Sequence, residues 1–275
     1  MPDDGAVATG AGLDAVMDRV RALHPAWPQA YAVDTRPLSG LPWQPLESAL
    51  PRLLAQAEEA APRGAVAVVA TSVGCALGHA VLGRVTAALV LGDRVWDGGP
   101  GALLVALDAT GYPERVALAP GTAVLDARGP AAHDVLDEVA RRAVATLAPL
   151  FDAVRSATGF GLVPLWNLAA DAVLSTATDL PAADGGGVEE QRRGRALGEA
   201  LVAALGRRGA RLRCRARVQC VEGPCGAVAV GVRGACCLAY RSEPAADPQG
   251  EGYCVTCPFV PDTARARRWP LEVSR

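Results

Sequence analysis

Lysine is absent from this 275-residue chain, and all 27 of its basic residues are arginine. We attribute this absence to a GC-rich genome rather than to function. Aromatic residues are also scarce, at 4% of the sequence, whereas 51% of the residues are hydrophobic. Ala, Val and Leu must therefore build the core, and the length suits one globular domain or two closely packed ones.

The chain also lacks the motifs of nucleotide-dependent and hydrolytic enzymes. It contains no P-loop, no Ser-x-x-Lys and no His-Glu-x-x-His sequence. The letters Gly10-x-Gly12-x-x-Ala15 match a dinucleotide fingerprint, but no strand precedes them, so we reject this assignment. We therefore expect no site for hydride transfer in this chain, and any electron would have to come from a separate donor.

A secretory signal is not expected, because residues 1–20 contain Asp and lack a basic start followed by an apolar run. Residues 64–83 are long enough to span a bilayer and hold no acid or arginine, yet they are mostly Ala, Gly and Val. We expect a buried helix there, or a strand followed by a helix, and no stable membrane insertion. The predicted location is the cytoplasm, with a peripheral position at the inner face of the membrane left open.

Charge is unevenly spread along the chain. Residues 1–180 hold 12 Arg and 19 acids, a sum of -7, whereas residues 181–275 hold 15 Arg and 10 acids, a sum of +5. The overall charge of -2 gives no global field that would point to nucleic acid. A basic C-terminal portion would instead attract an anionic substrate or an acidic electron donor.

Hydrophobic periodicity predicts an α+β protein that is mainly helical. The turn residues 109–113 between apolar runs at 102–108 and 114–118 predict an antiparallel β hairpin, and 226–233 reads as a short strand. We expect residues 1–180 to form a mainly helical portion, and 188–275 a C-terminal portion of the same continuous domain, joined by a loop at 181–187. Helices are predicted over 13–24, 46–61, 65–92 (with a break near Gly74 or Gly83), 132–157, 164–175 and 188–208.

The most informative feature is a group of four cysteines near the C-terminus. Cys236 and Cys237 are adjacent, sixteen residues follow, and Cys254-x-x-Cys257-Pro258 completes the pattern. Seven of the eight cysteines lie between 214 and 257. In a cytoplasmic protein such a cluster favours a metal over disulfides. The pattern therefore predicts one metal centre, either a tetrahedral zinc or an iron–sulfur cluster.

The adjacent pair shifts this choice toward iron–sulfur. Zinc sites usually use cysteines two to four residues apart, and neighbouring side chains on a strand point to opposite faces. Two adjacent thiolates can thus reach one small ion only with local distortion, whereas a cluster with more than one iron is a wider target.

The run Arg233-x-x-Cys236-Cys237-x-x-Tyr240-Arg241, closed by Cys254-x-x-Cys257-Pro258, resembles the C-terminal signature of FhuF-type ferric-siderophore reductases. The likeness is specific over about 30 residues and extends loosely to Leu165-Trp166-Asn167. It implies a [2Fe–2S] cluster on the four cysteines and a mainly helical fold like the C-terminal domain of siderophore synthetases. It also implies a ferric siderophore, of the hydroxamate class, as substrate.

One departure from that family is the spacing between the two cysteine pairs. The family usually has about ten residues there, and this chain has sixteen. The additional residues fall in 242–252, which has turn composition, and loop closure over six more residues costs only about 0.4 kcal/mol. We therefore expect the cluster to survive beside a longer exposed loop that tolerates shortening.

Residues around the four ligands carry further expectations. Arg233, Tyr240 and Arg241 flank the first pair and either hydrogen-bond the cluster and steer substrate or serve as ordinary packing and surface charge. The remaining cysteines fit no ligand spacing and are predicted to be dispensable: Cys75, Cys214, Cys220 and Cys225. The histidines are expected to be structural, with His79 the one nearest to a functional role: His24, His79 and His133.

The expected activity is that of an oxidoreductase acting on metal ions. The cluster would accept one electron from a ferredoxin or a flavin or NAD(P)H reductase and pass it to siderophore-bound Fe(III), which releases Fe(II). No acid–base residue beyond the cluster is required. The rival interpretation is a zinc-stabilised binding module whose basic face, Arg192–Arg217, takes an anionic partner. An acyl-transfer enzyme related to siderophore synthetases is disfavoured because no ATP-binding motif is present.

Overall fold

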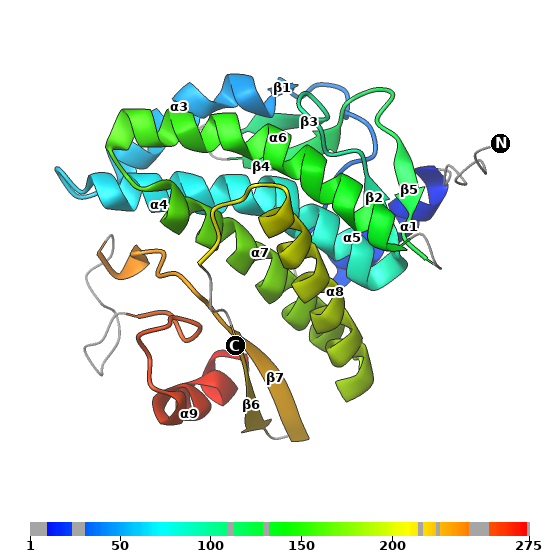
Figure 1. Ribbon diagram of the computed structural model, residues 1–275, viewed down its shortest axis with the longest axis vertical. Coiled ribbons are helices and arrows are strands. Elements are labelled where there is room, and N and C mark those ends of the chain that lie inside the picture. The colour runs from blue at the N-terminus through cyan, green and yellow to red at the C-terminus, as the bar shows by residue number, and fades with distance from the viewer. Residues whose placement is uncertain are drawn as a thin grey trace.

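The computed structural model describes residues 10–23, 31–108, 113–128, 132–213, 217–223, 226–241 and 253–273. These residues form a mainly helical α+β structure with small antiparallel sheets, as the sequence predicts (Figure 1). The helices are α1 (Gly10–Leu23), α3 (Leu46–Ala60), α4 (Val66–Gly78), the π-helix η1 (His79–Gly83), α5 (Arg84–Gly92), α6 (Ala132–Thr158), α7 (Leu162–Ala183), α8 (Val188–Arg207), the 3-10 turn η2 (Ala239–Arg241) and α9 (Asp262–Val273).

The apolar segment predicted at 65–92 forms one continuous helix, Val66–Gly92, made of α4, η1 and α5. It lies at the centre of the helical body. The expected break is absent at Gly74, where the glycine instead allows close packing: a Cβ there would lie 2.7 Å from Leu165 Cδ2 on α7. Gly83 ends the π-helical turn rather than the helix. Such turns cluster at functional sites, so His79 at its start is of interest below.

Helix α7 is longer than predicted, and residues 181–183 belong to its last turn rather than to a loop. Pro181 lies in this last turn and has no N–H to donate to the Ala177 carbonyl, and the chain leaves the helix at Asp184. Helix α8 then packs against α7 at short range. A Cβ at Gly194 would lie 2.4 Å from the Ala177 carbonyl oxygen, so only glycine allows this approach.

Short strands lie beside the helices. The predicted hairpin is confirmed as β3 (Leu103–Leu107) and β4 (Pro113–Leu118), which pair antiparallel, and β1 (Gln44–Pro45) adds an edge to β3. The strands β2 (Arg94–Trp96) and β5 (Val124–Asp126) form a separate antiparallel pair. The main hydrophobic core runs from Leu13 in α1 to Ala210 beyond α8, so α8 packs with the helical body.

The last described part of the chain, 217–223, 226–241 and 253–273, is called the cysteine lobe below. In Figure 1 its orange and red ribbons lie to one side of the helical body, near α4 and α7. It consists of the antiparallel hairpin of β6 (Arg217–Gly223) and β7 (Gly226–Val232), then η2 and α9. Strand β7 packs on α7, η2 on α4, and α9 on β6. The lobe therefore rests on the two helices that form the centre of the body.

The helix Val66–Gly92 is long and apolar enough to cross a membrane, but 67% of its most apolar window is buried inside the protein. This agrees with the expectation of a buried core helix and is compatible with a soluble protein. The cellular location stays a prediction.

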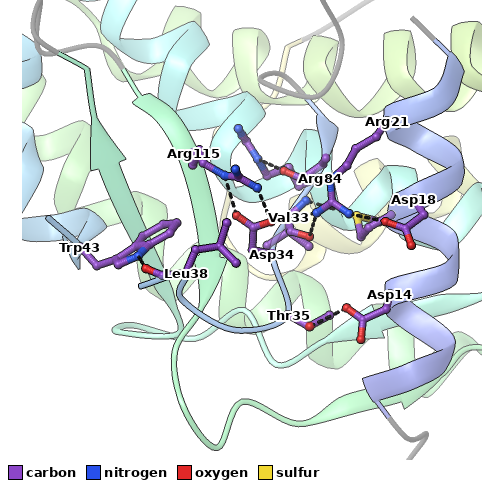
Figure 2. A network of polar contacts seen from close by, with 12 residues as sticks. Asp14, Asp18, Arg21, Val33, Asp34, Thr35, Leu38, Trp43, Arg84 and Arg115 are labelled. Carbon is purple, nitrogen blue, oxygen red and sulfur yellow. Dashed lines mark hydrogen bonds and ion pairs between the residues drawn. The ribbon is translucent and has the colours of Figure 1, made fainter. Parts of the chain in front are cut away.

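A network of charged groups joins α1, the segment after it and β4 (Figure 2). Asp34 is only 8% exposed and accepts hydrogen bonds from Arg115 Nε at 2.9 Å and from Arg21 at 2.9 Å. Arg84 is 2% exposed and donates from Nε to the Ala32 carbonyl oxygen at 2.8 Å. These bonds fix the segment 31–36 against α5 and β4.

Replacing Asp34 by Ala is expected to lower the free energy of unfolding by on the order of 3 kcal/mol, because two guanidinium groups lose their shared carboxylate. Urea denaturation followed by circular dichroism measures the change. Asp18→Ala is the matched control, since the Asp18 side chain is 74% exposed and pairs with the same Arg21. It should cost less than about 1 kcal/mol. Equal costs for the two variants would show that the buried network contributes little.

Candidate metal centre

The two cysteine pairs are brought together by backbone pairing within the cysteine lobe. After β7 ends at Val232, Arg233 N donates to the Thr256 carbonyl oxygen at 2.9 Å. This bond places the segment before Cys236 beside the segment between Cys254 and Cys257. The adjacency explains how pairs separated by sixteen residues can serve one site.

Three of the four predicted ligands form a chain of thiol contacts. The Cys254 thiol donates to the Cys257 sulfur, and Cys257 Sγ lies 3.8 Å from Cys236 Sγ. The hydrogen bond from Cys254, with help from the Phe259 N–H, lowers the pKa of Cys257 against the opposing effects of burial and Cys236. Cys257 is buried, Cys236 is half-buried and Cys254 is exposed, so the group reaches from the interior to the surface.

These thiols can be tested against the geometry of a metal centre. Two thiolates bound to one tetrahedral metal at about 2.3 Å lie about 3.8 Å apart. The Cys236–Cys257 separation of 3.8 Å equals that spacing. Among the residues that the structure describes, no group of three or more His, Cys, Asp or Glu is arranged so that it could hold a metal ion. The four thiols thus have the right chemistry for an iron–sulfur or zinc centre, and the Cys236–Cys257 sulfur spacing fits one. The sulfurs of Cys237 and Cys254 would have to move closer to complete it.

An uncommon backbone conformation directly follows the adjacent pair. Leu238, directly after the pair, has a φ of 59°, which is uncommon for a residue with a branched side chain. The Leu238 N–H donates to Cys236 Sγ at 3.4 Å. Cys236 thereby faces Cys257, whereas Cys237 lies near enough to Cys75 on α4 to help raise the pKa of that thiol.

Arg265 on α9 organises the Cys254-x-x-Cys257 segment, and sequence reasoning missed it. The side chain is fully buried. It donates to the carbonyl oxygens of Val255 at 2.8 Å, Cys257 at 2.8 Å and Val260 at 2.7 Å. It also bonds Asp262 and Gln219, which ties the segment to α9 and β6. An arginine seven residues beyond a Cys-Pro is no recognised signal, because only the folded lobe shows its carbonyl partners.

Arg233 is the cation most closely coupled to the thiols. It is half-buried. Burial alone would lower its pKa, but the nearby Cys254, Cys75 and Cys237 thiols and Asp171 outweigh burial and raise it. The side chain therefore stays charged beside the cysteines, in a position suited to stabilising negative charge on sulfur.

Tyr240 and Arg241 lie on the outer side of the lobe. The Tyr240 ring packs edge-on against Tyr253 at 4.8 Å, and Tyr253 packs against the 61% exposed Phe259. Arg241 is exposed, donates to the Tyr240 hydroxyl at 3.1 Å and lies over its ring. No bond from either side chain to a cysteine sulfur is found in the part of the chain that is described, so Arg233 is the better candidate for tuning the centre.

His79 belongs to a half-buried polar group behind Arg233. Burial, with Arg233 and Arg84, lowers the pKa of His79 to about 4, and its Nδ1 atom is buried without a hydrogen-bond partner in the described structure. Burial also raises the pKa of Asp179 to about 7 and that of Tyr31 to about 12. The His79 ring packs edge-on against Tyr31 at 5.7 Å. His79 is thus neutral near pH 7.

The other cysteines divide into two classes. Cys75 is half-buried on α4, and burial raises the pKa of its thiol to about 12, so it stays protonated. Cys220 is exposed on β6. Cys214, Cys225, His24 and the predicted loop 242–252 lie outside the described residues. That Cys75, Cys214, Cys220 and Cys225 are dispensable stays a prediction.

Comparison with known proteins gives no match to a protein-family model, to a curated protein or to a solved structure. The resemblance to FhuF-type reductases therefore rests on the cysteine segment and its neighbours alone. Functional conclusions have to come from the chemistry of the site.

Several arginines of the basic face in the rival interpretation form ion pairs within the described chain. Arg193 pairs with Asp93, Arg195 with Glu199, and Arg217 with Asp262. The remaining pairs join Arg192 to Glu189, and Arg207 and Arg208 to Asp137. Such exposed pairs are weak, and Arg211 and Arg213 on the same face are also exposed. The zinc-stabilised binding module therefore stays an alternative hypothesis.

Proposed function

We propose that the chain is a ferric-siderophore reductase of the FhuF type, in which Cys236, Cys237, Cys254 and Cys257 hold a [2Fe–2S] cluster. The observation that carries the proposal is the convergence of thiols, with two sulfurs 3.8 Å apart beside a half-buried cation, Arg233. The likeness to the C-terminal domain of siderophore synthetases, and the hydroxamate class of the substrate, belong to the same proposal.

The surroundings of the thiols support electron transfer at the surface rather than in a buried pocket. The recess that Arg233 lines with Asp171, Ser175 and Thr178 offers only about 20 Å³, room for about one water molecule. A siderophore is far larger and would have to approach the exposed Cys254 side. Electron transfer needs no bond between chelate and protein, so an open surface is sufficient.

Each neighbouring residue then has a definable task. The cluster would supply one-electron chemistry. Arg265 fixes the backbone of the Cys254–Cys257 segment, and the Leu238 N–H points at the Cys236 sulfur. Arg233 provides positive charge that favours an additional electron on the centre. Iron leaves the siderophore on reduction because Fe(II) binds hard, anionic oxygen ligands less tightly than Fe(III) does.

The activity is tested with protein that has been reduced by dithionite and freed of excess reductant under argon. Mixing with a ferric trihydroxamate should yield one Fe(II) per chain, trapped by a ferrous-specific chromogenic chelator. The protein's visible spectrum should return to the oxidised form at the same rate. If the reduced protein transfers no electron to ferric hydroxamate, catecholate or citrate chelates, the proposed activity is wrong.

Arg233→Gln is expected to lower the reduction potential of the centre by on the order of 50–100 mV, since a unit charge several ångströms away at an effective dielectric near 20 is worth about 2 kcal/mol. Arg241→Gln should change the potential much less, because Arg241 is exposed and stacks on Tyr240. Redox titration followed by the visible spectrum measures both. Equal shifts would show that the electrostatic coupling of Arg233 to the thiols does not matter.

A further inference from the structure

The turn that carries the adjacent cysteines is fastened to the helical body by two buried side chains that belong to different helices. Asp171 comes from α7 and Thr71 from α4, and the two helices pack on each other. Neither residue belongs to the lobe, and neither contact to the turn involves a sulfur atom. Both side chains bind the backbone of residues 234–237 instead.

Asp171 binds two successive amide groups directly before the cysteines. Its carboxylate accepts from Gly234 N at 2.7 Å and from Ala235 N at 2.9 Å, one amide for each oxygen. The residue is only 5% exposed. Two consecutive N–H groups that converge on one anion form a nest, and such an arrangement fixes the direction of the chain through it.

Thr71 binds the other end of the turn. Its hydroxyl donates to the Cys237 carbonyl oxygen, with Oγ1 2.7 Å away. The Val68 carbonyl oxygen, in the preceding helical turn, is a second and more distant acceptor at 3.1 Å. The residue is 1% exposed, so no water competes for this bond. The next residue, Leu238, has a left-handed φ of 59°, and its amide donates to Cys236 Sγ at 3.4 Å. A conformation of this kind persists only when its surroundings impose it.

We propose that Asp171 and Thr71 are positioning residues that hold the Cys236–Cys237 turn in the conformation required for metal binding. The effect on metal binding rests on the proposed metal centre. The effect on the conformation of the turn concerns the protein alone and can be measured without metal. Together the two side chains hydrogen-bond the backbone before Cys236, at residues 234 and 235, and after it, at residue 237. Without them the strained Leu238 can relax, and Cys236 Sγ then loses its alignment with Cys257.

The test compares Thr71→Val, which removes the hydroxyl while keeping the shape, with Thr71→Ser, which retains it. Thr146→Val is the matched control. Thr146 is 2% exposed and its hydroxyl binds the Gly98 carbonyl oxygen at 2.9 Å, far along the chain from the cysteines. Two quantities are measured: deuterium exchange of the amides in 234–238, and the rate at which iron passes to an external chelator.

Thr71→Val should speed both amide exchange and iron release about two- to tenfold, the effect of one lost buried hydrogen bond. Thr71→Ser should restore the wild-type rates. Thr146→Val should lower the melting temperature by a similar amount yet leave both rates unchanged. Asp171→Asn should act in the same direction, because an amide offers one acceptor oxygen and its NH₂ group opposes the second N–H.

Loss of metal binding and loss of the positioning role give different results in these experiments. If wild-type protein binds no iron, the proposed function is wrong, while amide exchange in the metal-free protein still decides whether the side chains hold the turn. If Thr71→Val and Asp171→Asn leave amide exchange and iron release at wild-type rates, the positioning role is overturned. The same holds if Thr146→Val accelerates iron release equally, because the effect would then reflect general stability.

Discussion

Replacing Cys257 by Ser is expected to remove nearly all bound iron and to abolish the visible absorption of the purified protein. Cys257 is the buried member of the thiol chain, and its sulfur lies 3.8 Å from that of Cys236. A hydroxyl is a much poorer ligand for iron than a thiolate and does not ionise near neutral pH. Iron analysis and the absorption spectrum of anaerobically purified protein measure the loss.

Cys220→Ser is the control for this prediction. Cys220 is an exposed cysteine of β6 within the same lobe. Its substitution should leave iron content and colour unchanged. The assignment of ligands is contradicted if Cys257→Ser keeps full iron, or if Cys220→Ser loses as much iron as Cys257→Ser does.

The second large effect is expected from Arg265→Lys. Lysine keeps the charge, but its single ammonium group cannot reach the carbonyls of Val255, Cys257 and Val260 together. Buried carbonyls that lose their partners cost about 1–3 kcal/mol each, so the cysteine lobe should lose on the order of 3–5 kcal/mol. We expect the lobe to open while the helical body stays folded.

Limited proteolysis and deuterium exchange resolved along the chain distinguish the two parts. Cleavage and exchange should rise within 217–273 and stay unchanged in α4, α6 and α7, and iron content should fall. Arg267→Lys serves as the control because Arg267 is exposed, two residues away on the same helix. A stable, fully protected lobe in Arg265→Lys would show that the five hydrogen bonds are dispensable.

Local patterns in the sequence were sufficient to predict much of the fold. The apolar spacing at 132–157 predicts α6 almost to its ends, and the turn at 109–113 predicts the β3–β4 pair. Periodicity could not predict the π-helical turn at His79, the length of α7 or the strand β6. These features depend on tertiary contacts, such as the approach of Gly194 to Ala177, that no local pattern encodes.

In the candidate site, too, local sequence patterns predicted some features, while others depend on tertiary contacts. Cysteine spacing predicted four thiol ligands, and the structure places the sulfurs of Cys236 and Cys257 3.8 Å apart. That all four are ligands stays a prediction. The residues that hold those thiols are remote in sequence. Asp171 lies 63 positions before Gly234, and Thr71 lies 166 positions before Cys237. An Asp or Thr within an apolar helix gives no sign of its partner until the fold brings the two together.

The central claim is that the four cysteines hold a [2Fe–2S] cluster, and metal and sulfide analysis with electron paramagnetic resonance tests it most directly. Protein purified without oxygen should be red-brown, should contain about two irons and two acid-labile sulfides per chain, and should give a rhombic signal only after one-electron reduction. A colourless protein with one zinc and no sulfide per chain would contradict the account and would favour a structural zinc site.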